Sequence, residues 1–78
     1  MTKKKKHIGI AIKRYRTDLG WSLREMASRV GLAHSTIAAI ERGDSNPSIE
    51  TLRLISDELQ IPISRLFLDI EYSNSEQK

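Results

Sequence analysis

Apolar residues recur at helical spacing along most of the chain. In the first stretch, five apolar side chains fall on one stripe of a helix: Ile8, Ala11, Ile12, Tyr15 and Leu19. Gly20 follows this stretch, and glycine is common where a helix ends. The pattern therefore predicts a first helix that begins at Ile8 and ends before Gly20.

A second and a third helix follow in quick succession. Ser22 can cap the second helix, and Glu25 stands three residues on, which is the capping-box arrangement. Gly31 closes that helix, and the third helix covers about residues 33–42, up to the next glycine. The residues that these two helices bury are Leu23, Met26, Ala27, Val30, Ile37 and Ile40.

The loop DSNPS leads from the third helix into a fourth. Pro47 and Ser48 are residue types that prepare a helix start. Four apolar residues then keep to one face: Ile49, Leu52, Ile55 and Leu59. The stretch IPISRLF predicts a short fifth helix after Pro62. The pattern thus predicts an all-α fold of five helices.

Length and composition restrict the function. A chain of 78 residues holds one small domain with a thin core, in which a catalytic cleft is hard to build. The absence of cysteine excludes disulfides and thiolate metal sites. No apolar run approaches the roughly 20 residues that a membrane-spanning helix needs, and no stretch resembles a signal peptide. We therefore expect a soluble, cytoplasmic protein with no membrane partner.

Charge is divided unevenly along the chain. Residues 1–43 contain ten lysines and arginines against three acidic residues, a net charge of +7, whereas residues 44–78 contain three against seven, a net charge of −4. Such a division suggests one surface that faces a polyanion and one that avoids it. Small domains also carry uneven charge without binding nucleic acid, so charge alone leaves both interpretations open.

The second and third helices form one unit at residues 23–42. Two short helices joined by a glycine turn cross steeply where the residues at the crossing are small, as Ala27 and Gly31 are. Ile37 and Ile40 hold the third helix on the core. Its outward positions are then Ala33, His34, Ser35, Ala38, Ala39 and Arg42. This arrangement is a helix-turn-helix.

On these residues the chain resembles the XRE-type helix-turn-helix regulators, which include phage repressors and Cro proteins. The family pattern continues through RYRTDLGWSLREMA, IERGDSNPSIETL and ELQIPISRLF, so that the resemblance covers about residues 8–67. It implies a phage-repressor-like, five-helix domain with its third helix in the major groove of double-stranded DNA. The function implied is that of a sequence-specific transcriptional regulator, of repressor or controller type.

The outward face of the third helix is the expected base-reading surface, formed by His34, Ser35, Ala38, Ala39 and Arg42. Alanine lets a helix lie close to the base edges and can touch a thymine methyl group. Simpler interpretations stay open: the two alanines as good helix formers, Ser35 as a helix cap, and Arg42 as a favourable cation at a helix end.

A second group of residues is expected to contact the DNA backbone: Lys3, Lys4, Lys5, Lys6, Ser22, Arg24, Thr36, Asn46 and Ser48. The lysines form a basic arm that either follows a duplex or is a solvated terminus. Thr36 matches a family position close to the second helix, which implies an internal methyl group and a hydroxyl that reaches a phosphate. Leu23 stands where many phage repressors have glutamine, and we expect it in the core.

Arg16 and Glu41 match a family pair that joins the first helix to the end of the third. The resemblance implies a partly buried ion pair that fixes how the third helix is presented. We expect this role to be structural, because loss of either partner would leave an uncompensated buried charge.

The expected organisation is a flexible basic arm (1–7), a DNA-binding domain (8–68) and a tail (69–78) that is a candidate for dimerisation. Domains of this type act in pairs on inverted-repeat operators, so we expect a homodimer. The dimer candidates are Leu54, Ile63, Leu66, Phe67, Leu68, Ile70 and Tyr72. The stretch LDIEY alternates with the period of a strand. Three interpretations of it stay open: that it pairs with its copy across a dimer, that it covers the core of its own chain, and that it frays.

Enzymatic function is not expected. Neither His7 nor His34 has a partner carboxylate at helical spacing, and the sequence contains no glycine-rich phosphate loop or metal-ligand cluster, so no cofactor or metal is expected. The alternative function is that of an antitoxin or adaptor whose main role is to bind a protein partner through residues 63–72.

Overall fold

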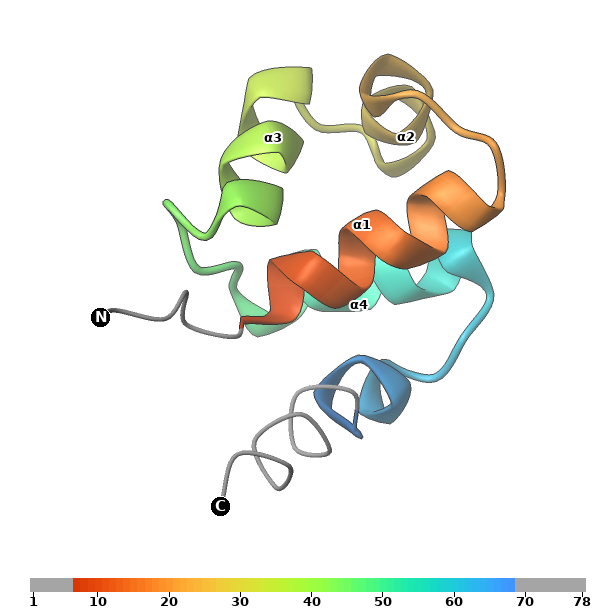
Figure 1. Cartoon of the computed structure of the whole chain (residues 1–78), viewed down its shortest axis with the longest axis vertical. Coiled ribbons are helices and arrows are strands. Elements are labelled where there is room, and N and C mark those ends of the chain that lie inside the picture. Colours follow the sequence, from red (N-terminus) through yellow and green to blue (C-terminus); the bar gives the residue numbers. More distant parts are fainter. Residues whose placement is uncertain (1–6, 69–78) are drawn as a thin grey trace, which may run out of the picture.

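The computed structural model describes residues 7–68 of the chain, and helices joined by short connections form this part (Figure 1). The helices are α1 (Ile8–Asp18), α2 (Leu23–Val30), α3 (His34–Arg42) and α4 (Ile49–Leu59). A fifth helical segment occupies residues 63–68, and no strand occurs between residues 7 and 68. The predicted all-α fold of five helices is confirmed.

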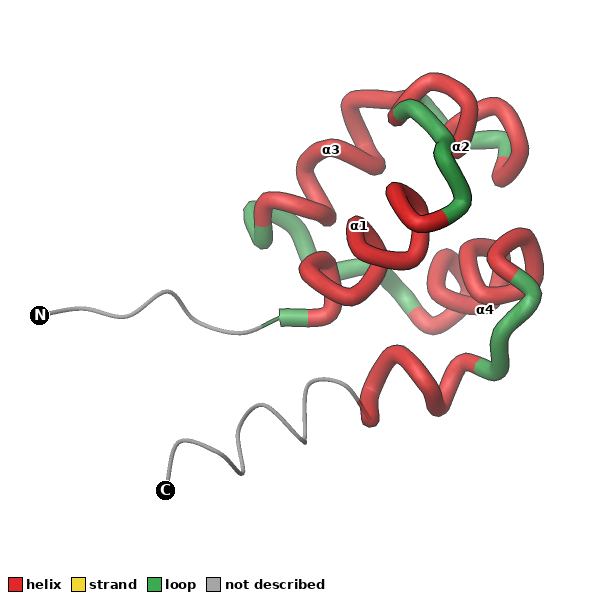
Figure 2. Tube along the Cα trace, turned by 45° about the vertical axis from the view of Figure 1, so that its right-hand side comes forward, coloured by secondary structure: helices red, strands yellow, loops and turns green. Residues whose placement is uncertain are grey.

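All five helical segments contribute to one core. Each segment buries one large side chain completely: Ile12, Met26, Ile37, Ile55 and Leu66. Burial of a side chain of this size contributes about 1.5–3 kcal/mol. Helix α3 packs against α1 and α2, and α2 also contacts α4. Segment 63–68 lies on the opposite side of α1 from α2 and α3, which leaves the outer face of α3 clear (Figure 2).

The turn between α2 and α3 has the predicted glycine geometry. Gly31 adopts a left-handed conformation with φ of 78°, and its N–H donates to the carbonyl of Ala27 at 2.8 Å. A side chain at this φ is disfavoured, so glycine allows α2 to end and the chain to turn sharply. Ser22 caps the start of α2, as predicted, by accepting a hydrogen bond from the Glu25 N–H. The Glu25 carboxylate binds Arg29 rather than completing a capping box.

Gly9 determines how closely α1 approaches α3. A Cβ atom at this position would overlap the carbonyl oxygen of Ile40 and lie 2.9 Å from the Cα atom of Glu41. Both obstacles are backbone atoms, which cannot rotate away as a side chain can. The hydrophobic pattern gave no sign of this contact.

The structure corrects several expectations at helix ends. Leu19, the C-cap residue of α1, and Ile49, the first residue of α4, belong to the predicted apolar stripes of their helices but are exposed. Both lie beyond the packed turns of their helices. His7, assigned to the basic arm, is instead the N-cap of α1, and its Nδ1 accepts a hydrogen bond from the Gly9 N–H at 3.2 Å. In the part of the chain that the structure describes, no helix has the length and apolar character needed to cross a membrane.

Candidate nucleic-acid interface

The outer face of α3 carries small or hydrogen-bonding side chains at its exposed positions. His34 and Ser35 are exposed in the first turn, and Ala38 and Ala39 are half-buried in the middle. Arg42 is exposed in the last turn. Ala38 and Arg42 also line one groove, which places them on the same face of the helix. The structure therefore exposes three of the five predicted base-reading residues on α3, His34, Ser35 and Arg42, and no acidic side chain of α3 is exposed among them. Ala38 and Ala39 are partly covered between them.

Ser35 is not a helix cap. The N-cap of α3 is Ala33, which has no capping side chain, and α3 begins at His34. Within residues 7–68, the Ser35 hydroxyl makes no hydrogen bond to another side chain or to the backbone. Its donor and acceptor are available to a ligand outside the chain.

The acidic side chain of α3, that of Glu41, lines the same groove as Ala38 and Arg42 but is largely buried and paired. Glu41 accepts two hydrogen bonds from Arg16, from Nε at 2.7 Å and from Nη2 at 3.0 Å. The exposed fractions of the two side chains are 10% for Arg16 and 6% for Glu41. Arg16 also donates from Nη1 to the Trp21 carbonyl at 2.6 Å. The expected ion pair is thus present, and the guanidinium of Arg16 neutralises the carboxylate of Glu41 beside the outer face of α3.

Two capped helix starts flank this face. Ser22 caps α2, and Ser48 caps α4 by accepting from the Thr51 N–H at 3.1 Å. Arg24 is exposed and forms no ion pair with any residue from 7 to 68, and Asn46 is exposed in the loop before α4. Such helix starts attract anions because their N–H groups point outward.

Among the residues expected to contact the DNA backbone, Thr36 lies differently from the prediction, and Lys13 was missed. Thr36 is exposed, so the expectation of an internal methyl group is wrong. Lys13, on α1, was not singled out in the sequence, yet it lines the same groove as Ala38 and Arg42. In the sequence, Lys13 is only a basic residue on the polar side of α1. Apolar spacing does not distinguish a lysine that contacts DNA from one that is merely solvated. The residues Lys3–Lys6 lie outside the described part of the chain.

Arg42 has an acidic neighbour that the sequence analysis also missed. Its Nε donates to Oδ2 of Asp44 at 2.8 Å, and each side chain is 62% exposed. Asp44 follows the glycine that ends α3 and lines the same groove.

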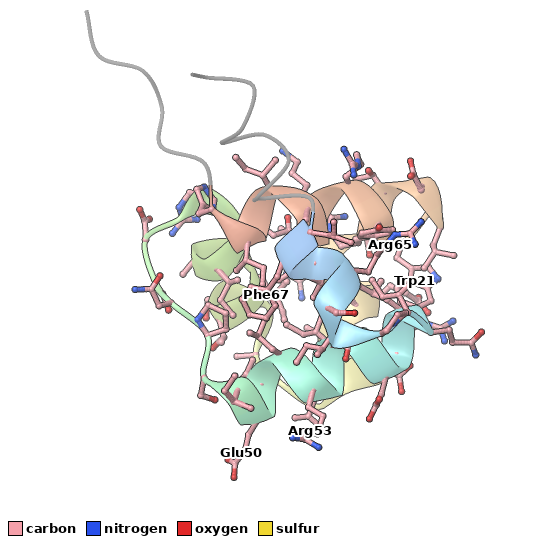
Figure 3. All side chains as sticks on the ribbon, turned by 90° about the horizontal axis from the view of Figure 1, so that it is seen from below. Trp21, Glu50, Arg53, Arg65 and Phe67 are labelled. Carbon is pink, nitrogen blue, oxygen red and sulfur yellow. The ribbon has the colours of Figure 1, made fainter. Side chains whose placement is uncertain are left out.

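The dimer candidates divide into three groups. Leu54, Phe67 and Leu68 are exposed, and Figure 3 places Phe67 on segment 63–68, with Arg53 and Glu50 projecting from α4. Leu66 has no exposed surface, so its prediction as a surface residue is wrong, because it completes the core of its own chain. Ile63 is half-buried and packs against the core. Ile70 and Tyr72 lie outside the described residues, as does most of the alternating stretch LDIEY.

Comparison with known proteins gives a consistent result. A family model described as helix-turn-helix matches residues 12–66. The HTH-type transcriptional regulator SinR of Bacillus subtilis (strain 168) is 42% identical over 60 residues, which are 76% of this chain and 54% of SinR. The chain thus spans about half the length of that relative.

Two solved structures with similar folds contain SinR. A crystal structure of SinR, described as the master regulator for biofilm formation, in complex with DNA has a TM-score of 0.75 and 40% identity, covering 78% of this chain and 98% of that chain. A structure of the SinR protein/SinI protein complex has a TM-score of 0.74 and 41% identity, covering 77% of this chain and 59% of that chain.

Proposed function

Because the chain belongs to the XRE-type helix-turn-helix family, whose members are DNA-binding transcriptional regulators and not enzymes, we propose that it binds double-stranded DNA sequence-specifically and regulates transcription as a repressor or controller. The single observation that carries the proposal is the face of α3, where His34 and Ser35 offer hydrogen bonds beside two alanines. Such a protein is cytoplasmic and associates with the nucleoid through its binding to DNA.

The chemistry of this face suits the major groove. That groove is wide enough for a helix and presents a distinct set of donors, acceptors and methyl groups for each base pair. Ala38 and Ala39 keep the α3 backbone close to the base edges, whereas glutamate or lysine there would hold it away. His34, Ser35 and Arg42 have the donors and acceptors that read base edges.

Backbone contacts position α3 in this proposal. Ser22 and Arg24 at the start of α2, and Asn46 and Ser48 at the start of α4, lie where phosphates flank an inserted helix. Thr36 adds an exposed hydroxyl, the arm Lys3–Lys6 adds charge, and we include Lys13 because it borders the same groove as Arg42. These contacts give affinity that falls as salt rises, and they do not read sequence.

We infer further that the protein binds as a homodimer. Two-fold dimers of helix-turn-helix domains bind inverted half-sites roughly 34 Å apart, one turn of the DNA helix. The exposed side chains of Leu54, Phe67 and Leu68 provide apolar surface on the C-terminal side of the domain for such contact.

A second candidate function is the binding of a protein partner, as in an antitoxin or adaptor. The observation that favours it is the same exposed apolar surface, together with the existence of a SinR protein/SinI protein complex among the similar structures. This function does not require the small and hydrogen-bonding side chains on the outer face of α3, and it therefore explains less of the structure than DNA binding does.

Selection of binding sites from a random duplex library, at two salt concentrations, tests the proposal. An enriched inverted repeat with fixed spacing is the expected result. If no sequence is enriched and binding disappears as salt rises, only the charge of the protein binds DNA, and the protein-partner function takes its place.

A further inference from the structure

The ion pair between Arg42 and Asp44 lies at the point where α3 ends and its outer face stops. Both side chains are well exposed, and an exposed ion pair of this kind adds little to stability. Its main physical effect is on geometry, because a carboxylate bound to Nε limits the orientations that the planar guanidinium adopts.

The backbone holds Asp44 firmly in place. Gly43 takes a left-handed conformation with φ of 86°, its N–H donates to the Ile40 carbonyl at 3.1 Å, and the Asp44 N–H donates to the Ala39 carbonyl at 2.9 Å. These two bonds form a Schellman motif. The ring of His7 packs on Gly43, since a Cβ atom there would lie 2.7 Å from His7 Nε2. The Asp44 carboxylate is therefore attached to a segment with little freedom.

The guanidinium of Arg42 keeps its outer edge available. Only Nε contacts Asp44, and within residues 7–68 neither Nη1 nor Nη2 of Arg42 has a hydrogen-bond partner. These two nitrogens carry the parallel N–H groups that bind O6 and N7 of guanine in the major groove. Arg42 also lines one groove with Ala38, one helical turn earlier on α3.

Charge favours a base over a phosphate as the target. Arg42 and Asp44 together are neutral, so the pair has little net attraction for the DNA backbone, and a phosphate near Arg42 would be repelled by the carboxylate. A guanine edge has no net charge. Resting on the proposed function, we propose that Asp44 is a positioning residue that orients Arg42 to read one guanine in each half-site.

Library selection with four variants tests this role: Arg42→Ala, Asp44→Ala, the double variant, and Asp57→Ala. Asp57 is an exposed acid on α4, and its loss makes the same change in net charge without touching Arg42. We expect the wild type to select a guanine at one position of each half-site, and Arg42→Ala to lose that selection. Asp44→Ala should weaken the guanine preference by roughly tenfold at that position alone. The double variant should lose no more of the preference than Arg42→Ala does by itself.

Other results would overturn the inference. If Asp44→Ala keeps the guanine and tightens binding to all sequences as Asp57→Ala does, Asp44 acts only through its charge. If the wild type selects a motif that Arg42→Ala leaves unchanged, the positioning role fails while the proposed function stands. If the wild type selects no motif, both fail. Equal melting temperatures for wild type, Asp44→Ala and the size-matched variant Asp44→Asn would exclude a loss of folding as the cause.

Discussion

Arg16 and Glu41 are 25 residues apart in the chain and join the last turn of α1 to the last turn of α3 through two hydrogen bonds. The same guanidinium binds the carbonyl of Trp21 in the connection to α2. One buried cation therefore holds three parts of the chain in register. The orientation of α3 on the domain depends on this contact as well as on apolar packing.

Glu41→Ala should strongly destabilise the domain. The substitution leaves the Arg16 guanidinium buried without its counter-charge, which costs about 3–5 kcal/mol. A domain of this size has a total stability on the order of 4–12 kcal/mol, so much of the protein would be unfolded near its working temperature. Denaturant unfolding followed by circular dichroism measures the loss.

The matched control is Glu25→Ala, which breaks the exposed ion pair with Arg29, where both side chains are more than two-fifths exposed. That change should cost less than about 1 kcal/mol. Equal stability of the Glu41→Ala variant and the wild type would show that the buried pair does not hold α3 in place.

Gly9→Ala should lower the melting temperature, although alanine is the better helix former. At an exposed helical site the change would stabilise by roughly 0.5–1 kcal/mol. Here the added Cβ meets the backbone of Ile40 and Glu41, and overpacking of this kind costs about 1–3 kcal/mol. Calorimetry measures the melting temperature, and the direction of its shift shows whether the close contact between α1 and α3 or the helix propensity of alanine dominates.

Ser28→Ala serves as its control, because Ser28 is exposed inside α2 and alanine there meets no packed backbone. It should leave the melting temperature unchanged or raise it slightly. A rise for Gly9→Ala as well would mean that α1 and α3 are further apart than the structure has them.

The difference between a position packed against another helix, such as Gly9, and an exposed one, such as Ser28, also explains what the sequence could and could not predict. Apolar spacing identified α1 to α4 because each of them buries residues three or four apart, and in segment 63–68 the half-buried Ile63 and the buried Leu66 have the same spacing. It could not identify the contact of Gly9 with Ile40, because spacing along one helix carries no information about which backbone approaches it. Leu66 was misplaced for a related reason: a segment as short as 63–68 has too few positions to separate a buried face from an exposed one.

The candidate site was predictable to a different extent. The outward positions of α3 followed from the two isoleucines that hold it on the core. The ion pair of Arg16 was accessible only through family resemblance, since nothing local links residues in different helices. Asp44 was missed because its contact with Arg42 depends on the left-handed turn at Gly43, which brings the chain back toward the helix end.

Ala38→Glu should abolish sequence-specific DNA binding without unfolding the protein. A glutamate in the middle of the α3 face holds the helix away from the base edges and repels phosphates, so we expect affinity to fall by at least roughly a hundredfold. Fluorescence anisotropy with the selected operator measures this loss.

Ser64→Glu makes the same charge change on segment 63–68, on the opposite side of α1 from α3 (Figure 1), and should bind nearly as well as the wild type. Similar losses in both variants would point to net charge rather than to the α3 face.

Phe67→Asp should convert a dimer into monomers if the exposed apolar surface of segment 63–68 is the homodimer contact. Ile10→Asp is a close control, because both side chains are 43% exposed and both changes place one negative charge on an apolar site, but Ile10 lies on α1 in the groove beside α3. Sedimentation equilibrium without DNA should therefore give monomers for Phe67→Asp and the wild-type state for Ile10→Asp. The Phe67→Asp variant should still occupy a single half-site, because the α3 face is intact, but should lose the gain in affinity that two linked half-sites provide. If the wild type is itself monomeric and still selects inverted repeats, DNA brings the two copies together and Phe67 is not the contact that joins them in solution.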